Sequence, residues 1–130
     1  MASIFSKIVK GDIPAHKIAE DDNYLAFLDI FPLAKGHILV IPKEEVDYIF
    51  DLEDDHLAGL MKFAKKIAEA QRKVIPCLRI GVAVIGLEVP HAHVHLVPLN
   101  SVGDINFERP KLKFSQEELA DIAARIKEAL

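Results

Sequence analysis

The clearest periodic pattern lies in the middle of the chain, where apolar residues recur at the spacing of one helix face. From Leu57 onward these residues are Leu60, Met61, Ala64, Ile67, Ala68 and Ile75. Charged residues cover the opposite face, as in an amphipathic helix with one buried side. Pro76 follows the run and cannot continue it, so we expect one long helix over residues 52–75.

A second helical pattern closes the chain. Ser115 and Glu118 form a capping-box pair, in which the serine hydroxyl and the glutamate side chain satisfy main-chain N–H groups at a helix start. The apolar residues that follow at helical spacing are Leu119, Ile122, Ile126 and Leu130. The pattern predicts a terminal helix over residues 115–130, preceded by a loop from about residue 100.

Strand patterns surround the long helix. Residues 36–42 and 78–86 are short, apolar and rich in β-branched side chains, as buried strands are. Residues 16–29 carry turn formers at their centre and predict a hairpin, and residues 91–99 predict the last strand. The pattern as a whole predicts an α+β fold, with an antiparallel sheet of about five strands, one long helix and a C-terminal helix.

Composition narrows the class of protein. A chain of 130 residues has the length of a single domain, and we assign residues 1–130 to one. The net charge of −4 argues against a nucleic-acid partner bound by bulk positive charge. The single cysteine cannot form an internal disulfide, and no leader or membrane-spanning run is evident, so we expect a cytoplasmic protein without a membrane partner.

Three histidines at alternate positions mark the candidate site. In the stretch VPHAHVHLVP, His91, His93 and His95 would share one face of a strand, about 6.6 Å apart. That spacing suits a shared phosphate-sized group better than three ligands on one metal ion. His37, at the start of residues 36–42, is the fourth candidate, because a sheet could bring it beside the three. Imidazole can serve as nucleophile, base or acid near neutral pH.

Together these residues resemble the histidine triad (HIT) family of nucleotide-binding proteins and hydrolases. HAHVHLVP matches the family's alternation of histidine and apolar residues. The stretch from Ile4 to Lys43 is also similar, with its Gly-x-Ile-Pro turn, Phe-x-Asp-x-x-Pro segment and Gly-His-x-Leu-x-x-Pro strand. The resemblance covers about residues 3–99 and leaves the loop and helix of residues 100–130 outside it. It implies a HIT-like fold and a homodimer, with residues 52–75 and neighbouring strands in the interface.

The resemblance also implies roles for individual residues. His93 would attack the α-phosphorus of a purine nucleotide conjugate and form a nucleotidyl-histidine. His95 would contact the phosphate or leaving group, His91 and His37 would orient the other imidazoles, and Asp29 would bind the ribose or cap a turn before Pro32. The base and ribose pocket would be walled by Phe5, Ile8, Phe27, Ile30 and Leu39. No cofactor and no metal ion are expected.

Departures from the family precede the triad. Where relatives carry polar donors for phosphate, this chain has Leu87 and Glu88, and residues 79–86 contain neither Asn nor Gln. Glu88 would select a positively charged leaving group, raise the pKa of a triad imidazolium, or point into solvent. Some relatives also complete a zinc site from a Cys-x-x-Cys pair, where this chain has Ser3 and Ser6. Without thiolates the usual four-ligand zinc site is not available.

Three functions follow from these observations. The leading one is a nucleotide phosphoramidase, which hydrolyses or transfers a nucleotide from a phosphoramidate. A dinucleoside polyphosphate hydrolase is the close alternative among enzymes. The departures at Leu87 and Glu88 favour a third, a nucleotide-binding module with little catalytic activity. A metal-binding or purely structural sheet protein is the weakest interpretation of the histidines.

Overall fold

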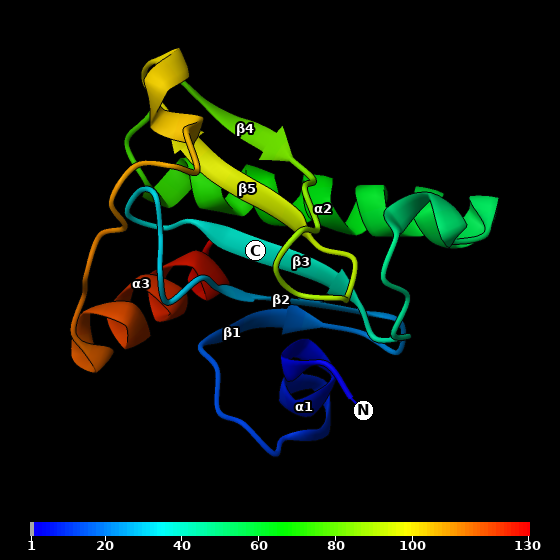
Figure 1. Ribbon diagram of the computed structural model, residues 1–130. Helices are drawn as coiled ribbons and strands as arrows, with labels where there is room; N and C mark the ends of the chain where they lie inside the picture. Colours follow the sequence, from blue (N-terminus) through cyan, green and yellow to red (C-terminus); the bar gives the residue numbers. More distant parts are fainter. Residues whose placement is uncertain (1) are drawn as a thin grey trace.

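A five-stranded antiparallel sheet organises the protein. The computed structural model describes residues 2–130. The strands run in the order β1-β2-β3-β5-β4, and all neighbours are antiparallel, as the sequence predicts (Figure 1). Their bounds are β1 Lys17–Glu20, β2 Tyr24–Leu28, β3 Ile38–Pro42, β4 Arg79–Ala83 and β5 Val94–Leu99.

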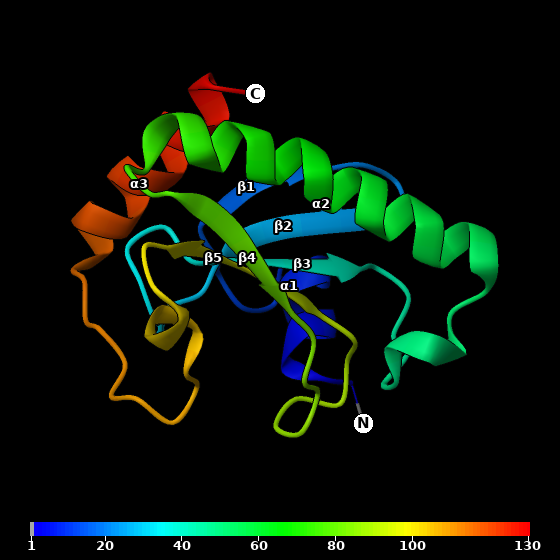
Figure 2. The ribbon, with the colours of Figure 1, turned by 90° about the horizontal axis from the view of Figure 1, so that it is seen from above.

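The two faces of the sheet carry different layers. The long helix α2, Asp54–Val74, lies across one face, and the short helix α1, Ile4–Lys10, lies on the other (Figure 2). Alternate residues of β3 therefore enter separate cores: Ile38 and Val40 pack in the α2 cluster, and Leu39 and Ile41 in the α1 cluster. In Figure 2 the segments after β4 and after β5 both extend on the α1 side of the sheet.

Helix α1 is an element that the sequence pattern did not predict. Ser3 is its N-cap and accepts a hydrogen bond from the Ser6 main-chain N–H, while Gly11 ends it in a left-handed conformation with φ of 83°. Glycine is the residue that adopts this conformation without steric cost. Helix α1 is therefore complete within its seven residues, with a cap at each end.

The last strand is shorter than predicted, because its first residues bond elsewhere. The strand expected at residues 91–99 begins only at Val94. The main-chain N–H of His91 donates to Val89, and that of Ala92 donates to Val46 in the segment after β3. Neither bond belongs to the sheet ladder, so the segment that carries the first two triad histidines is a loop held between neighbouring segments.

The C-terminal helix α3, Gln116–Glu128, covers the core beside α2. Ser115 and Glu118 form the predicted capping box at its start. Its buried residues Leu119, Ile122, Ala123 and Ile126 belong to the same cluster as the inner face of α2. Over residues 2–130, none of the helices combines the length and the apolar character needed to cross a membrane.

Candidate active site

Two histidines meet at the centre of the sheet on its α1 side. His37 lies just before β3, and His95 lies in β5 directly opposite Leu39. Nε2 of His37 is 3.0 Å from Nδ1 of His95. The Leu33 main-chain N–H donates to Nδ1 of His37 at 3.0 Å, so the proton of a neutral His37 must be on Nε2. His37 therefore donates to His95, whose own proton is left on Nε2.

Burial keeps this pair neutral. His37 is 1% exposed and His95 is 8% exposed. Burial, with the nearby positive charge of Lys111, lowers the pKa of His37 to about 4. Burial, with the neighbouring His37, lowers the pKa of His95 to about 3. Both imidazoles are therefore uncharged at neutral pH, and their hydrogen bonds fix one tautomer for each.

His93 is oriented by the main chain of its own segment. Its Nδ1 lies 2.7 Å from the carbonyl oxygen of His91, which can only accept a hydrogen bond. Nδ1 of a neutral His93 therefore carries the proton, and Nε2 retains its lone pair. The ring also lies edge-on to Phe5, with centroids 5.0 Å apart, and 4.9 Å from the His95 ring. His93 is thus a buried imidazole with one nitrogen available as a nucleophile.

His91 is directed into the protein. Its Nε2 donates to the Pro42 carbonyl oxygen at 2.8 Å, and its Nδ1 lies 2.8 Å from the Ser3 hydroxyl. Its side chain is completely buried, and burial lowers its pKa. Of the three triad residues only His95 lies within β5, so the prediction of one strand carrying all three is wrong. The reason is that residues 91 and 92 bond outside the ladder.

Asp29 lies beside the histidine pair and also caps a turn. Its Oδ2 is 3.6 Å from Nε2 of His37, and its Oδ1 accepts a hydrogen bond from the Phe31 main-chain N–H at 2.8 Å. The carboxylate is 17% exposed, and one of its oxygens remains available to a ligand. The turn-capping contact that the sequence suggested is therefore present, and it holds the carboxylate next to His37.

Four of the five predicted apolar wall residues gather under the site. Phe5, Ile8, Phe27 and Leu39 are buried in one cluster on the α1 side of the sheet. Ile30 lies apart from them, 51% exposed in the segment after β2. Phe5 contacts the His93 ring directly, and the other three belong to the same apolar cluster as Phe5.

Two residues of the site were missed from the sequence. Phe107 places its ring edge-on to His95, with centroids 4.6 Å apart, and 6.2 Å from the His37 ring. The Lys111 ammonium lies 5.9 Å from the Phe107 ring centre and donates to the Phe107 and Arg109 carbonyl oxygens. Both belong to the loop between β5 and α3, which has neither a motif nor periodicity that would have identified them.

The segment before the triad borders an apolar cavity. The cavity measures about 620 Å³ and includes Leu87, Ala92 and His93 in its lining, together with aromatic side chains after β3 and residues of α2. Leu87 is 89% exposed and Glu88 is exposed without lining the cavity. Of the predicted site residues, only His93 lines this space.

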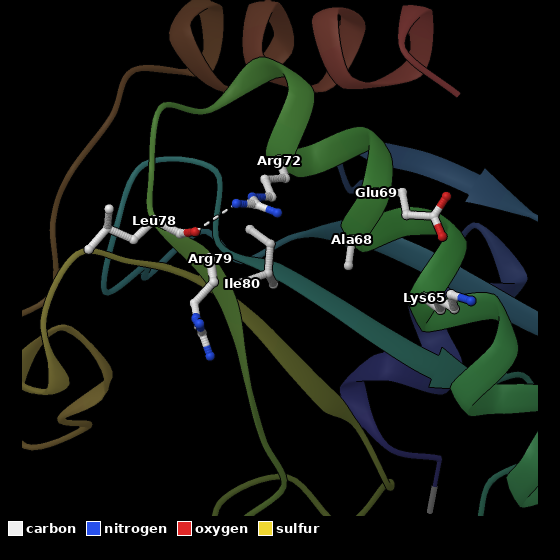
Figure 3. A pocket seen from close by; sticks show the side chains of 7 residues that line it. All are labelled: Lys65, Ala68, Glu69, Arg72, Leu78, Arg79 and Ile80. Carbon is white, nitrogen blue, oxygen red and sulfur yellow. Dashed lines mark hydrogen bonds between the residues drawn. The ribbon is translucent and has the colours of Figure 1, made fainter.

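A second hollow, between α2 and β4, is separate from the histidines. It measures about 420 Å³ and is lined mostly by charged and aliphatic side chains, including Lys65, Glu69 and Arg79 (Figure 3). The guanidinium of Arg72 donates to the Leu78 carbonyl oxygen at 2.9 Å across it. None of the predicted site residues lines this hollow.

One group in the described part of the chain could hold a metal ion. Asp29, His37 and His95 offer ligand atoms within 4.8 Å of one another. Binding would require the proton on Nε2 of His37 to leave, because that nitrogen is the one that faces the group. Within this group His37 is hydrogen-bonded to His95, and Oδ2 of Asp29 lies 3.6 Å from Nε2 of His37.

Comparison with known proteins identifies the class. The HIT domain matches residues 10–102. An adenosine 5′-monophosphoramidase of Schizosaccharomyces pombe is 38% identical over 128 residues, which cover 97% of this chain and 96% of that protein. This chain belongs to the histidine triad family.

Solved structures show the same fold. A HIT-like protein from Bartonella henselae, described as involved in cell-cycle regulation, has a TM-score of 0.84 and 32% identity over 98% of this chain and 96% of that one. A zinc-bound histidine triad protein from Mycobacterium smegmatis has a TM-score of 0.81 and 30% identity, covering 99% and 93% of the two chains. The α+β architecture predicted from the sequence is thus the HIT fold.

Proposed function

We propose that this protein is a nucleotide-binding hydrolase that acts at the α-phosphate of a purine nucleotide conjugate, with phosphoramidates as the leading substrates. The observation that carries the proposal is the 2.7 Å contact between His93 Nδ1 and the His91 carbonyl oxygen, which leaves a lone pair on His93 Nε2. The similarity to a yeast adenosine 5′-monophosphoramidase supports the substrate class.

The proposed reaction has two steps at His93. Nε2 attacks the α-phosphorus, a phosphorus–nitrogen bond forms, and the bond to the leaving amine breaks while the amine takes up a proton from solvent. Water then attacks the same phosphorus, the bond to His93 breaks, and the nucleoside monophosphate leaves with a proton released to solvent. Both steps place the phosphoryl group between His93 and the groups that stabilise its charge.

The neighbouring residues have supporting roles in this proposal. His95, neutral and with its proton on Nε2, donates a hydrogen bond to the phosphate or leaving group rather than acting as a charged acid. His37 fixes that tautomer by donating to His95 Nδ1. Asp29 accepts from the ribose hydroxyls with the oxygen that is not bonded to the Phe31 N–H. Lys111 contributes positive charge at the rim.

A homodimer is part of the same proposal. Strand β4 lies at the edge of the sheet, where its outer main-chain groups are available for pairing. Val82, Val84 and Ile85 are between 40% and 53% exposed along this edge. The apolar cavity next to His93 opens beside the same segment, so a second copy of the chain would cover exposed apolar surface there.

Two alternatives remain as outcomes of the test. A dinucleoside polyphosphate hydrolase would use the same His93 with a phosphate leaving group. A binding module with little turnover is favoured by Leu87, which offers no hydrogen-bond donor, and by Ala83, which stands opposite His95 in β4. Loss of a donor of this kind costs about 10²–10³ in rate where it is catalytic.

The test is incubation with adenosine phosphoramidate, with AMP release and the mass of the His93 peptide as measurements. The proposal expects AMP release by the wild type and none by His93→Ala. A preference for dinucleoside polyphosphates over phosphoramidate would establish the first alternative. Tight AMP binding without turnover or adduct would establish the second.

A further inference from the structure

A polar cluster on the far side of His91, made of two buried serines and the exposed Glu45, has no part in the roles described above. Oε1 of Glu45, in the segment after β3, accepts hydrogen bonds from the Ser3 main-chain N–H and the Ser6 hydroxyl, both at 2.6 Å. The Ser3 hydroxyl lies 2.8 Å from Nδ1 of His91, and the Ser6 hydroxyl is 3.4 Å from the same nitrogen. Both serines are buried.

The protons in this cluster can be assigned without ambiguity. The Pro42 carbonyl oxygen only accepts, so Nε2 of a neutral His91 carries the proton and Nδ1 has a lone pair. The Ser3 hydroxyl then donates to Nδ1 of His91 and accepts from the Ser6 main-chain N–H at 3.0 Å. The Glu45 carboxylate only accepts, so the Ser6 hydroxyl donates to it.

The same imidazole is joined to the nucleophile through the main chain. The His91 carbonyl oxygen accepts the proton of His93 Nδ1 at 2.7 Å. Hydrogen bonds therefore connect Glu45 to the Ser3 main chain, the Ser3 hydroxyl to the His91 ring, and the His91 carbonyl to His93, with the covalent structure of Ser3 and His91 between them. A shift of the His91 main chain would move the acceptor that orients His93.

We infer that Glu45, acting with Ser3 and Ser6, is a positioning residue for His93. It anchors the start of α1 so that the Ser3 hydroxyl holds His91 in a single neutral tautomer and orientation. The His91 carbonyl is thereby fixed where it selects the His93 tautomer with a free Nε2. The inference rests on the proposed function only for the role of His93 as nucleophile.

The cluster is not a nucleophilic serine site. The Ser3 hydroxyl is 2.8 Å from a histidine, but its residue is only 6% exposed and the hydroxyl both donates and accepts within the protein. The other nitrogen of His91 is bonded to Pro42 and cannot pass a proton to a substrate. Its geometry therefore serves to hold groups in place. The negative charge is also stable, since the bonds from Ser6 and Ser3 lower the pKa of Glu45 to about 2.

The test compares Glu45→Ala with Glu45→Gln, which keeps an oxygen acceptor for both serines. Glu44→Ala is the matched control, because Glu44 is the adjacent carboxylate and contacts His56 instead. The ¹⁵N chemical shifts of the imidazoles report the tautomers of His91 and His93 directly. We expect mixed tautomers and about a tenfold lower kcat with little change in KM for Glu45→Ala, and recovery in Glu45→Gln.

Two results would overturn the inference. One is unchanged His91 and His93 tautomers in Glu45→Ala, and the other is the same loss in Glu44→Ala. If Glu45→Ala detaches α1, Ser6→Ala is the milder variant, because it removes only one hydroxyl donor to Glu45. Wild-type tautomers of His91 and His93 together with wild-type kcat in Ser6→Ala would count against the inference. Absence of turnover in the wild type would refute the proposed function. The ¹⁵N chemical shifts of His91 and His93 would still show whether Glu45 positions His93, because they do not depend on turnover.

Discussion

Nε2 of His37 donates to Nδ1 of His95 across 3.0 Å, and the direction of that bond is set by the Leu33 main-chain N–H on the other side of His37. A single main-chain donor in the turn before β3 thus determines where the proton of His95 is. The pair is buried and neutral, so the proton of His95 is on Nε2, the nitrogen that would donate to phosphate in the proposed reaction. This relationship leads to a prediction about acid stability.

The free energy of unfolding should fall with decreasing pH below about 6.5. The pKa values of His37 and His95 are lowered to about 4 and about 3 in the folded protein, so the unfolded chain binds more protons in this range. The contribution of these two histidines to the free energy of unfolding is complete above pH 6.5 and is lost as the pH falls towards 4. The loss is about 1.4 kcal/mol per pH unit for each extra proton that the unfolded chain binds.

Denaturant unfolding at a series of pH values measures this dependence. His95→Asn retains an acceptor oxygen near the position of Nδ1 and removes one titrating group. The free energy of unfolding of His95→Asn should therefore fall less steeply with decreasing pH below 6.5, by the equivalent of about one proton bound on unfolding. Equal slopes for the two proteins would show that His95 is not a source of the acid sensitivity.

Gln71 connects α2 to the strands that carry the site. Its side-chain amide donates to the Gly36 carbonyl oxygen at 2.8 Å and to the Leu96 carbonyl oxygen at 2.9 Å, next to His37 and His95 respectively. Replacing it with methionine keeps the volume but removes both bonds. We expect Gln71→Met to lower the free energy of unfolding by about 2–3 kcal/mol.

Thermal or denaturant unfolding tests this value, with Lys66→Met as the control on the exposed side of the same helix. The control should differ from wild type by less than about 0.5 kcal/mol. A loss in Gln71→Met no larger than that in Lys66→Met would mean that the two carbonyl contacts do not stabilise the helix–sheet junction.

Lys111 should strengthen the binding of a nucleotide phosphate. Its charge lies over the Phe107 ring, whose edge contacts His95, and it contributes to lowering the pKa of both His37 and His95. Lys111→Ala is therefore expected to raise the Kd for AMP several-fold, an effect that should shrink at high salt. Calorimetric titration provides the measurement.

Lys113→Ala is the matched control, because Lys113 is an exposed lysine two residues further along the same loop. An equal loss of affinity in both variants would indicate a general effect of net charge. A specific loss in Lys111→Ala would place the loop between β5 and α3 in the binding site.

A charge on the edge strand should disrupt the proposed homodimer. Val82 is 53% exposed on β4, and Val82→Glu would place a carboxylate in the apolar surface that a second copy would cover. Sedimentation equilibrium should give a dimer mass for wild type and a monomer mass for Val82→Glu. Ile4→Glu alters an exposed residue on α1, on the other side of the sheet from α2, and should remain dimeric. A monomeric wild type would refute this part of the proposal.

Much of the fold follows from patterns that are local in the sequence. The periodicity of α2, the capping box of α3 and the apolar runs of the central strands each reflect a short-range rule, and all were predicted. The helix α1 was not, because its seven residues contain too few turns for a periodic pattern. The early end of the ladder before Val94 depends on a bond between Ala92 and Val46, which no local pattern encodes.

The candidate site also contains residues that the sequence predicts and residues that only the tertiary structure reveals. The alternating histidines and His37 were recognisable as chemistry-bearing residues, and the structure brings His37 within hydrogen-bonding distance of His95. The positions of Phe107, Lys111 and Glu45 depend on tertiary contacts across the chain. Glu45 is one of two adjacent glutamates, and only the structure shows that one bonds Ser3 and Ser6 while the other contacts His56.

The most direct test of the proposed mechanism is trapping of the nucleotidyl enzyme. Wild-type protein and His93→Ala would be mixed with adenosine phosphoramidate, quenched within one turnover, and digested for mass spectrometry. The proposed mechanism predicts an AMP adduct on the peptide containing His93, on Nε2 of that residue, and no adduct or AMP release in His93→Ala. An adduct on another residue, or AMP release that persists in His93→Ala, would contradict it.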